Sequence, residues 1–331
     1  MSAASADVSA AARPSRGWTG RDIAIAVVFL LLALTPLLAR FGAEGFLVGM
    51  MTRVMIYAIA ALSLDLILGY GAMVSFGHAA FVGIGAYAVG ILSAHGVNDL
   101  LIQTMAALIA SALFALATGA LSLRTKGVYF IMITLAFGQM IFFLAVSLSA
   151  YGGDDGMSLS GRSTLFGANL FSGVTPFFYL ALACLIGIYL LCRAIVASRF
   201  GRVLRGAKEN PTRMEAIGFS PFRYQLTAYV IAGMIAALAG VLLANQTGFV
   251  SPAYMAWQRS GELLMMVILG GVGTLVGPIV GALAFLLLEE QLSHITQHWK
   301  MIFGPFLILL VLFARGGILG VAAKLSGRRD G

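Results

Sequence analysis

The chain has 331 residues, of which 60% are hydrophobic and 10% are charged, with a formal net charge of +8. No soluble domain of this size can bury so much apolar surface, and the apolar runs do not alternate as the strands of a membrane β-barrel do. Runs of about 20 apolar residues, the length that crosses a hydrocarbon layer of roughly 30 Å, recur from Ile23 to Gly320. The composition therefore predicts an all-α polytopic membrane protein, whose basic residues orient the spans rather than bind nucleic acid.

Ten membrane spans are predicted in chain order, at residues 22–39, 47–68, 72–94, 100–122, 128–149, 174–197, 225–246, 261–272, 275–291 and 302–320. They give an N-terminal tail (1–21), a transmembrane domain (22–320) containing a loop at 150–173 and a basic segment at 198–223, and a C-terminal tail (321–331). The first apolar run could instead be a cleaved signal peptide. No convincing small-x-small cleavage site follows it, so it is counted as a span.

Basic residues predict which ends of the spans face the cytoplasm. They lie before the first span, after the fourth (Arg124 and Lys126), between Arg193 and Arg223, and at the C-terminus. All fall on one side only if the stretch from Gly261 to Glu290 crosses the membrane twice, which places both termini in the cytoplasm. Spans two to five and seven to ten then have opposite topology, as in an inverted repeat, with a faint echo between GAMVS (71–75) and GFVS (248–251).

Each half contains a glycine-rich stretch, GYGAMVSFGHAAFVGIGAYAVG at 69–90 and ILGGVGTLVGPIVGALAF at 268–285. Interrupted helices in both halves indicate a permeation pathway, because unwound backbone is tolerated only against protein or water. Close helix packing is the alternative, since small residues recur at every fourth position. The packing candidates are Ala79, Gly83, Gly273, Gly277 and Gly281, with Ser75 at the head of the first stripe. Packing does not account for the polar side chains of Ser75 and His78, which a continuous helix would place one turn apart on one face.

The basic segment 198–223 predicts a short cytoplasmic helix. Asn210 suits the N-cap, Pro211 the first helical position and Gly218 the C-terminal cap, and Pro221 prevents continuation. A helix of about two turns is marginal alone, so it needs a surface to dock on. A partner protein is the first candidate for that surface and lipid headgroups are the second. A solvated loop that only sets topology is the remaining interpretation.

Motifs for catalysis are absent from the sequence. It contains no G-x-x-x-x-G-K-[ST] phosphate loop, no zinc spacing between its histidines and cysteines, and no legible Ser/His/Asp arrangement. Cys184 and Cys192 would lie about 12 Å apart along one helix, too far for a disulfide. We therefore expect a protein that is not an enzyme and that binds no cofactor or metal itself.

The stretch GYGAMVSFGHAAFVGIGAY resembles the signature of the permease subunits of branched-chain amino acid ABC importers, specifically the longer, M-type subunit. Four further blocks agree, at residues 123–140, 151–158, 200–240 and 261–282. The resemblance covers most of the chain from Leu62 onward. The first span and the N-terminal tail contain no motif specific to the family.

The resemblance implies a bacterial inner-membrane assembly with a second related permease, two cytoplasmic ATPases that bind ATP and Mg²⁺, and a periplasmic binding protein. The family pattern favours two different permeases over a homodimer. The short helix would be the coupling helix that sits in a cleft of the ATPase, and Glu215, Ala216 and Gly218 match an E-A-A…G-like loop with shortened spacing. The residues expected to couple to the ATPase are Arg205, Lys208, Glu209, Asn210, Pro211, Arg213, Glu215, Ala216 and Gly218.

The candidate residues of the substrate pathway are Asp65, Ser75, Gly77, His78, Thr134 and Ser251. Asp65 stands where family members often carry Asn, and an acid inside an apolar span costs about 3 kcal/mol on insertion scales. Either Asp65 meets an ammonium or amide group of the substrate, or it is a structural acid that caps backbone groups beside residues 69–71. Thr134 could instead bond to its own helix backbone. Glu262 is expected at a span end, near the outer water.

Other cargoes fit the same architecture, among them urea, short amides, other amino acids or a sugar, because selectivity is set largely by the binding protein. A different class of function is an autonomous secondary transporter driven by an ion gradient. That class predicts transport by this chain alone, whereas the importer interpretation predicts none without the ATPase.

Overall fold

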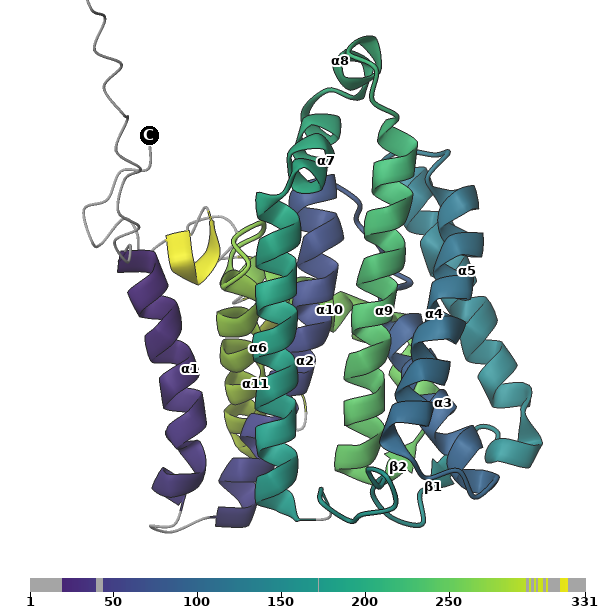
Figure 1. The fold of residues 1–331 in the computed structure, drawn as a ribbon, viewed down its shortest axis with the longest axis vertical. Helices are drawn as coiled ribbons and strands as arrows, with labels where there is room; N and C mark the ends of the chain where they lie inside the picture. Colours follow the sequence, from purple (N-terminus) through teal and green to yellow (C-terminus); the bar gives the residue numbers. More distant parts are fainter. Residues whose placement is uncertain are drawn as a thin grey trace, which may run out of the picture.

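The structure, a computed structural model, describes residues 20–39, 44–171 and 173–295, together with 298, 301, 303–305, 308 and 316–320. Within these residues the chain forms a helical bundle (Figure 1). Its long helices are α1 (Gly20–Ala39), α2 (Glu44–Gly71), α3 (His78–Ala94), α4 (Leu100–Ser122), α5 (Val128–Ser147), α6 (Val174–Ala197), α9 (Pro221–Thr247), α10 (Trp257–Gly270) and α11 (Gly277–Ile295). Its short elements are η1 (Ser149–Tyr151), β1 (Met157–Ser158), α7 (Arg199–Glu209), α8 (Pro211–Ala216), β2 (Phe249–Val250) and η2 (Pro252–Met255).

The bundle has two distinct ends, named here the β end and the α8 end (Figure 1). At the β end, strand β1 pairs antiparallel with β2, which joins the loop after α5 to the end of α9. The side chain of Gln246 donates to the carbonyl oxygen of Gly49 at 2.7 Å and so places the start of α2 at this end. At the α8 end, α7 and α8 connect the end of α6 to the start of α9. Helices α2 and α9 therefore run antiparallel.

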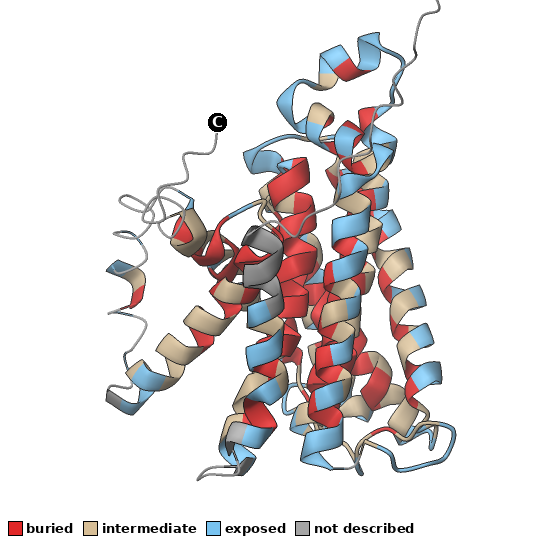
Figure 2. Ribbon diagram, turned by 60° about the vertical axis from the view of Figure 1, so that its left-hand side comes forward, coloured by how far each residue is buried: buried red, intermediate tan, exposed pale blue. Residues whose placement is uncertain are grey.

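Helix α2 is the central element of the fold. In its most apolar stretch 94% of the residues are buried within the chain, compared with 28%, 22% and 28% in α4, α5 and α6. The outer helices expose large apolar side chains, such as Leu113, Tyr129 and Phe143, as a lipid-facing surface requires. Figure 2 shows the same division, with buried residues on the inner helices and exposed residues on the outer ones and on α7 and α8.

Glycines allow the inner helices to approach closely. A Cβ atom at Gly240 of α9 would overlap with the carbonyl oxygen of Val82 on α3, and one at Gly85 of α3 would overlap with that of Ala237 on α9. Helices α10 and α11 form a similarly tight pair, since a Cβ at Gly281 would overlap with the carbonyl oxygen of Met266. Such contacts between backbones are typical of helices that associate in lipid.

The predicted spans agree with the structure only in part. Five described helices are long and apolar enough to cross a bilayer, namely Gly45–Gly71, Leu100–Ser122, Val128–Ser147, Val174–Ala197 and Pro221–Thr247. The predicted span 72–94 was placed too early, because residues 72–77 are not helical and α3 begins at His78. The predicted span 261–272 begins too late, because α10 starts at Trp257.

Two parts of the predicted layout have no test in this structure. Most of the tenth span (302–320) and both tails, apart from residues 20–21, lie outside the described residues. The count of ten spans and the opposite topology of the two halves therefore stay predictions.

Candidate functional site

A non-helical stretch, residues 72–77, runs from the end of α2 back into the bundle. Ala72 adopts a left-handed conformation (φ 55°) that ends α2, and the amide of Met73 donates to the carbonyl oxygen of Ile67 at 3.0 Å. The Thr134 hydroxyl of α5 accepts from the amide of Phe76 at 3.3 Å. A Cβ atom at Gly77 would overlap with the carbonyl oxygen of Thr134, so only glycine fits here. Two candidate pathway residues, Gly77 and Thr134, thus hold this stretch against α5.

Helix α3 starts deep inside the bundle. His78 Nε2 lies 2.8 Å from the hydroxyl oxygen of Ser63, which is eight residues, or about 12 Å, before the end of α2. Ser63 gives its single proton to the carbonyl oxygen of Ala60 at 2.6 Å, so the contact places the imidazole proton on Nε2. Nδ1 is then an acceptor, buried and without a hydrogen bond to the described part of the chain.

The start of α3 meets the start of α10. The amide of Ala79 donates to the Ser260 hydroxyl at 3.0 Å, and the side chain of Met255 in η2 fills the space next to Gly83. Residues 248–256 after α9 contain β2 and the short 3-10 helix η2 and enter from the β end, whereas residues 72–77 enter from the α8 end. Two interrupted helices from distant parts of the sequence therefore begin side by side inside the bundle.

A second interruption, residues 271–276, separates α10 from α11. The fully buried carboxylate of Asp65 accepts from the amides of Gly273 (2.7 Å, Oδ1) and Leu275 (3.4 Å, Oδ2). The Tyr70 hydroxyl donates to the carbonyl oxygen of Gly273 at 2.8 Å. These contacts are those of a structural acid that caps unwound backbone. They lie at residues 273–275, whereas residues 69–71, where the structural interpretation expected a break, are still helical at the end of α2.

The two stripes of small residues are interrupted. Ser75 and Gly273 lie in the non-helical stretches, so neither continues a helical stripe, and Ser75 does not share a helix face with His78. Ser75 is fully buried, has no hydrogen-bond partner of good geometry among the described residues, and lies near the Tyr229 hydroxyl of α9. Ser251 caps η2, where its hydroxyl accepts from the amide of Ala253 at 3.2 Å.

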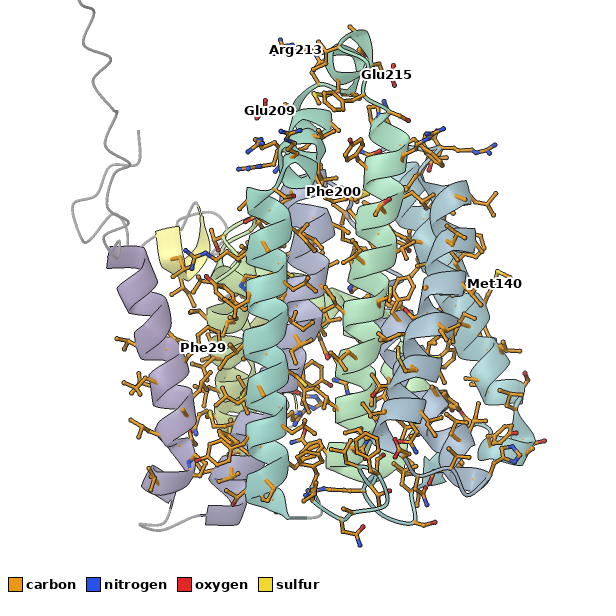
Figure 3. The ribbon with its side chains drawn as sticks, viewed as in Figure 1. Phe29, Met140, Phe200, Glu209, Arg213 and Glu215 are labelled. Carbon is orange, nitrogen blue, oxygen red and sulfur yellow. The ribbon has the colours of Figure 1, made fainter. Side chains whose placement is uncertain are left out.

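The short helix predicted at 211–217 is present as α8 and has the expected cap. The Asn210 side chain accepts from the amide of Arg213 at 2.9 Å, Pro211 occupies the first turn, and Gly218 is left-handed (φ 88°). Met214 is the buried residue of α8 and packs on Gly206 of α7. The sequence reasoning missed α7 itself. Figure 3 shows Glu209, Arg213 and Glu215 at the tip of the molecule, beyond the ends of the long helices.

Lys208 joins this segment to the core of the bundle. Its ammonium donates to the carbonyl oxygen of Gly69 at 2.7 Å and lies close enough to attract the Asp65 carboxylate. A Cβ at Gly69 would overlap with Asp65 and with the backbone of Gly273. A connected set of contacts thus runs from α7 through the end of α2 to the interruption between α10 and α11. Arg205, another basic residue of the expected coupling set, donates to carbonyl oxygens near the α6–α7 junction.

A charged cluster that the sequence reasoning missed lies nearer the β end. We call it the Arg259 cluster, and its members are Arg53, Tyr57, Arg259, Glu262 and Glu289. The guanidinium of Arg259 donates to Glu262 Oε2 at 2.6 Å, and Arg53 lies 3.9 Å from Glu289 Oε2 and over the Tyr57 ring at 5.8 Å. Only Glu262 had been singled out. A charge inside a predicted span is a signal of function, and that rule would have marked Arg53, although not its partners.

Metal-binding clusters do not occur in the described residues, where no three His, Cys, Asp or Glu side chains gather to hold an ion.

Comparison with known proteins identifies the family of this chain. Residues 46–312 match the family described as branched-chain amino acid transport system / permease component. The chain is 28% identical to the high-affinity branched-chain amino acid transport system permease protein LivM of Escherichia coli K12, over 92% of this chain and 76% of that protein. The corresponding Salmonella typhimurium protein is 28% identical over 81% of this chain and 68% of its own length.

Two further relatives match a smaller part of the chain. LivH of Escherichia coli K12 is 32% identical over 37% of this chain and 40% of that protein. LsrC of Klebsiella pneumoniae, an autoinducer 2 import system permease protein, is 30% identical over 46% of each chain. No solved structure matches.

Proposed function

The chain belongs to the family of branched-chain amino acid transport permeases, and from that premise we propose that it is the M-type permease subunit of an ABC importer. Its cargo is a branched-chain or related amino acid, delivered by a periplasmic binding protein. Transport is driven by ATP hydrolysis on two cytoplasmic ATPase subunits. The observation that carries this proposal is the pair of interrupted helices, α3 and α10, which begin against each other inside the bundle.

A second permease is the expected membrane partner. LivM and LivH are separate proteins, and this chain resembles both, LivM over most of its length. The β end faces the periplasm and the α8 end the cytoplasm of a bacterial inner membrane, with both termini cytoplasmic. In this arrangement ten spans form two halves of opposite topology, which the antiparallel course of α2 and α9 supports.

Helix α8 is the surface that receives the ATPase. All of its residues except the buried Met214 and the partly buried Pro211 are exposed, and Ile217, just beyond it, is 61% exposed. An exposed apolar side chain at the tip of a short, capped helix supports docking in a cleft of a partner protein. When ATP closes the ATPase pair, α8 and α7 move together because Met214 is packed on Gly206.

The displacement reaches the pathway through the contacts of Lys208. The lysine holds Gly69 at the end of α2, and Asp65, one turn earlier, holds the amides of the second interruption. Unwound segments can rearrange with less loss of hydrogen bonding than helix interiors, because their backbone groups already rely on tertiary partners. A shift of α7 therefore changes access at the interruptions rather than bending the long helices.

Reconstitution tests this function. We expect proteoliposomes containing this chain, the second permease, the ATPases and the binding protein to accumulate labelled L-leucine only with ATP. This chain contains no phosphate loop, so the ATPase subunits must supply the ATP-binding sites. Leucine uptake by this chain alone under an ion gradient would instead identify a secondary transporter.

The cap of α8 allows a milder test of coupling. Asn210→Ala removes the acceptor for the Arg213 amide and is expected to weaken α8 by about 1 kcal/mol. ATP-driven import should fall severalfold while the thermal midpoint of the bundle stays unchanged, because α8 projects from it. Thr212→Ala is the control, since Thr212 is exposed on the same helix and makes no side-chain hydrogen bond to the described residues. Equal import by the two variants would argue against a role for α8.

A further inference from the structure

We propose that Arg259 receives the carboxylate of the amino acid as it enters from the β end. This inference rests on the proposed function and adds a contact residue that neither the family match nor the pathway candidates include. It is drawn from the geometry of the Arg259 cluster.

Arg259 has hydrogen-bond donors to spare. Its Nη1 donates to Glu262 Oε2, and its other N–H groups make no hydrogen bond to the part of the chain that the structure describes. The side chain is 33% exposed, so it is not sealed within the bundle. The planar fork of an arginine matches the two oxygens of a carboxylate, and the hydroxyl of Tyr57, close enough to interact with Arg259, adds a neighbouring donor.

The surroundings fit a zwitterion with an apolar side chain. Arg259 lines a small cavity whose walls include Tyr57, Tyr254 and the apolar side chains of Val82, Leu243 and Leu263. Glu262 and Glu289 are charge partners of the two arginines and can attract an ammonium group. Positive, negative and apolar groups thus border one space.

The cavity is too small for an amino acid in this structure. It holds about 10 Å³, room for roughly one water molecule, so an amino acid enters only when neighbouring elements separate. The elements that would have to separate are η2 and the first turn of α10, which are joined through the non-helical residue Ala256. Arg259 stands in that first turn, beside the meeting point of Ala79 and Ser260.

A purely structural role explains the arginine poorly. Its hydrogen-bonded ion pair with Glu262 lies within one helix turn, and Arg259 acts on α2 and α11 through longer-range attraction to Tyr57 and Glu289. Such a pair adds little stability, whereas removing both charges from water is unfavourable. A binding role accounts for retaining the charge at this depth.

Leucine import by the full assembly in proteoliposomes tests the inference. Arg259→Gln should reduce ATP-driven import of labelled L-leucine by roughly ten- to hundredfold, the effect of losing a charged hydrogen bond. Basal ATP hydrolysis should stay at the wild-type value, whereas the thermal midpoint should fall, because the Glu262 carboxylate, whose side chain is 9% exposed, loses its partner. Arg124→Gln, an exposed arginine at the α8 end, is the matched control and should import normally.

A charge exchange separates binding from structure. The double variant Arg259→Glu with Glu262→Arg restores an ion pair in the same helix turn but displaces the receiving arginine. We expect it to fold and to remain defective in import. Wild-type import by the double variant, or by Arg259→Gln, would overturn the inference while leaving the importer assignment intact. Failure of the wild-type assembly to import leucine would instead count against the proposed function.

Discussion

Gly240→Ala is expected to prevent normal accumulation of folded protein. Helices α3 and α9 touch backbone to backbone, and the new Cβ would overlap with the carbonyl oxygen of Val82 and approach the amide of Ala86 to 3.0 Å. Main-chain atoms cannot rotate away as a side chain can, so the two helices must separate. Overpacking of this kind costs roughly 1–3 kcal/mol, and the separation would also disturb the start of α3, where His78 meets Ser63.

Thermal unfolding in detergent measures this effect. Gly187→Ala is the matched control, because Gly187 lies in the interior of α6 with nothing within 4 Å of an added Cβ. The control should keep or slightly raise the thermal midpoint, since alanine is the better helix former by roughly 1 kcal/mol. If Gly240→Ala unfolded at the same temperature as Gly187→Ala, the close approach of α3 and α9 would be wrong.

Asp65→Ala is expected to destabilise the protein and abolish transport together. The change leaves the amides of Gly273 and Leu275 buried without their acceptor, at a cost of roughly 1–3 kcal/mol for each stranded group. It also removes the negative charge that lies near Lys208. The segment between α10 and α11 would lose its fixed conformation, and leucine import by the reconstituted assembly should fall to background.

Asp65→Asn distinguishes capping from charge. The asparagine keeps one acceptor oxygen for Gly273 but turns an amide group toward Leu275, so stability should lie between those of wild type and Asp65→Ala. Asp154→Asn, at an exposed site at the β end, is the control for loss of a carboxylate and should change neither quantity. Unimpaired import by Asp65→Ala would refute both the capping role and contact with substrate.

Local signals predicted some elements well. The sequence Asn210-Pro211 followed by Gly218 contains the start and stop of α8, because capping is decided by residues a few positions apart. The glycine-rich stretches also indicated where helices are interrupted, because this signal too comes from residues close together in the sequence. The predicted starts of α3 and α10 were wrong by several residues, since the ends of those helices depend on tertiary contacts, Thr134 with Phe76 and Ser260 with Ala79.

Tertiary arrangement could not be predicted from a single sequence. Nothing near Asp65 in the chain reveals that its carboxylate caps residues more than 200 positions later. The Arg259 cluster combines α2, α10 and α11, and its members look like isolated charges when each is viewed in its own segment. Lys208 was expected to meet an ATPase from its place in the basic segment, and its bond to Gly69 emerges only from the fold.

Lys208→Met tests most directly whether the segment around α8 controls the interruption between α10 and α11. The variant keeps most of the aliphatic length but cannot donate to Gly69, and Lys126→Met is a control at an exposed lysine of the same end. The ratio of imported leucine to hydrolysed ATP should be measured for both in the reconstituted assembly. We predict that Lys208→Met hydrolyses ATP and imports little leucine, whereas Lys126→Met keeps the wild-type ratio. A wild-type ratio in Lys208→Met would contradict transmission through Lys208, Gly69 and Asp65.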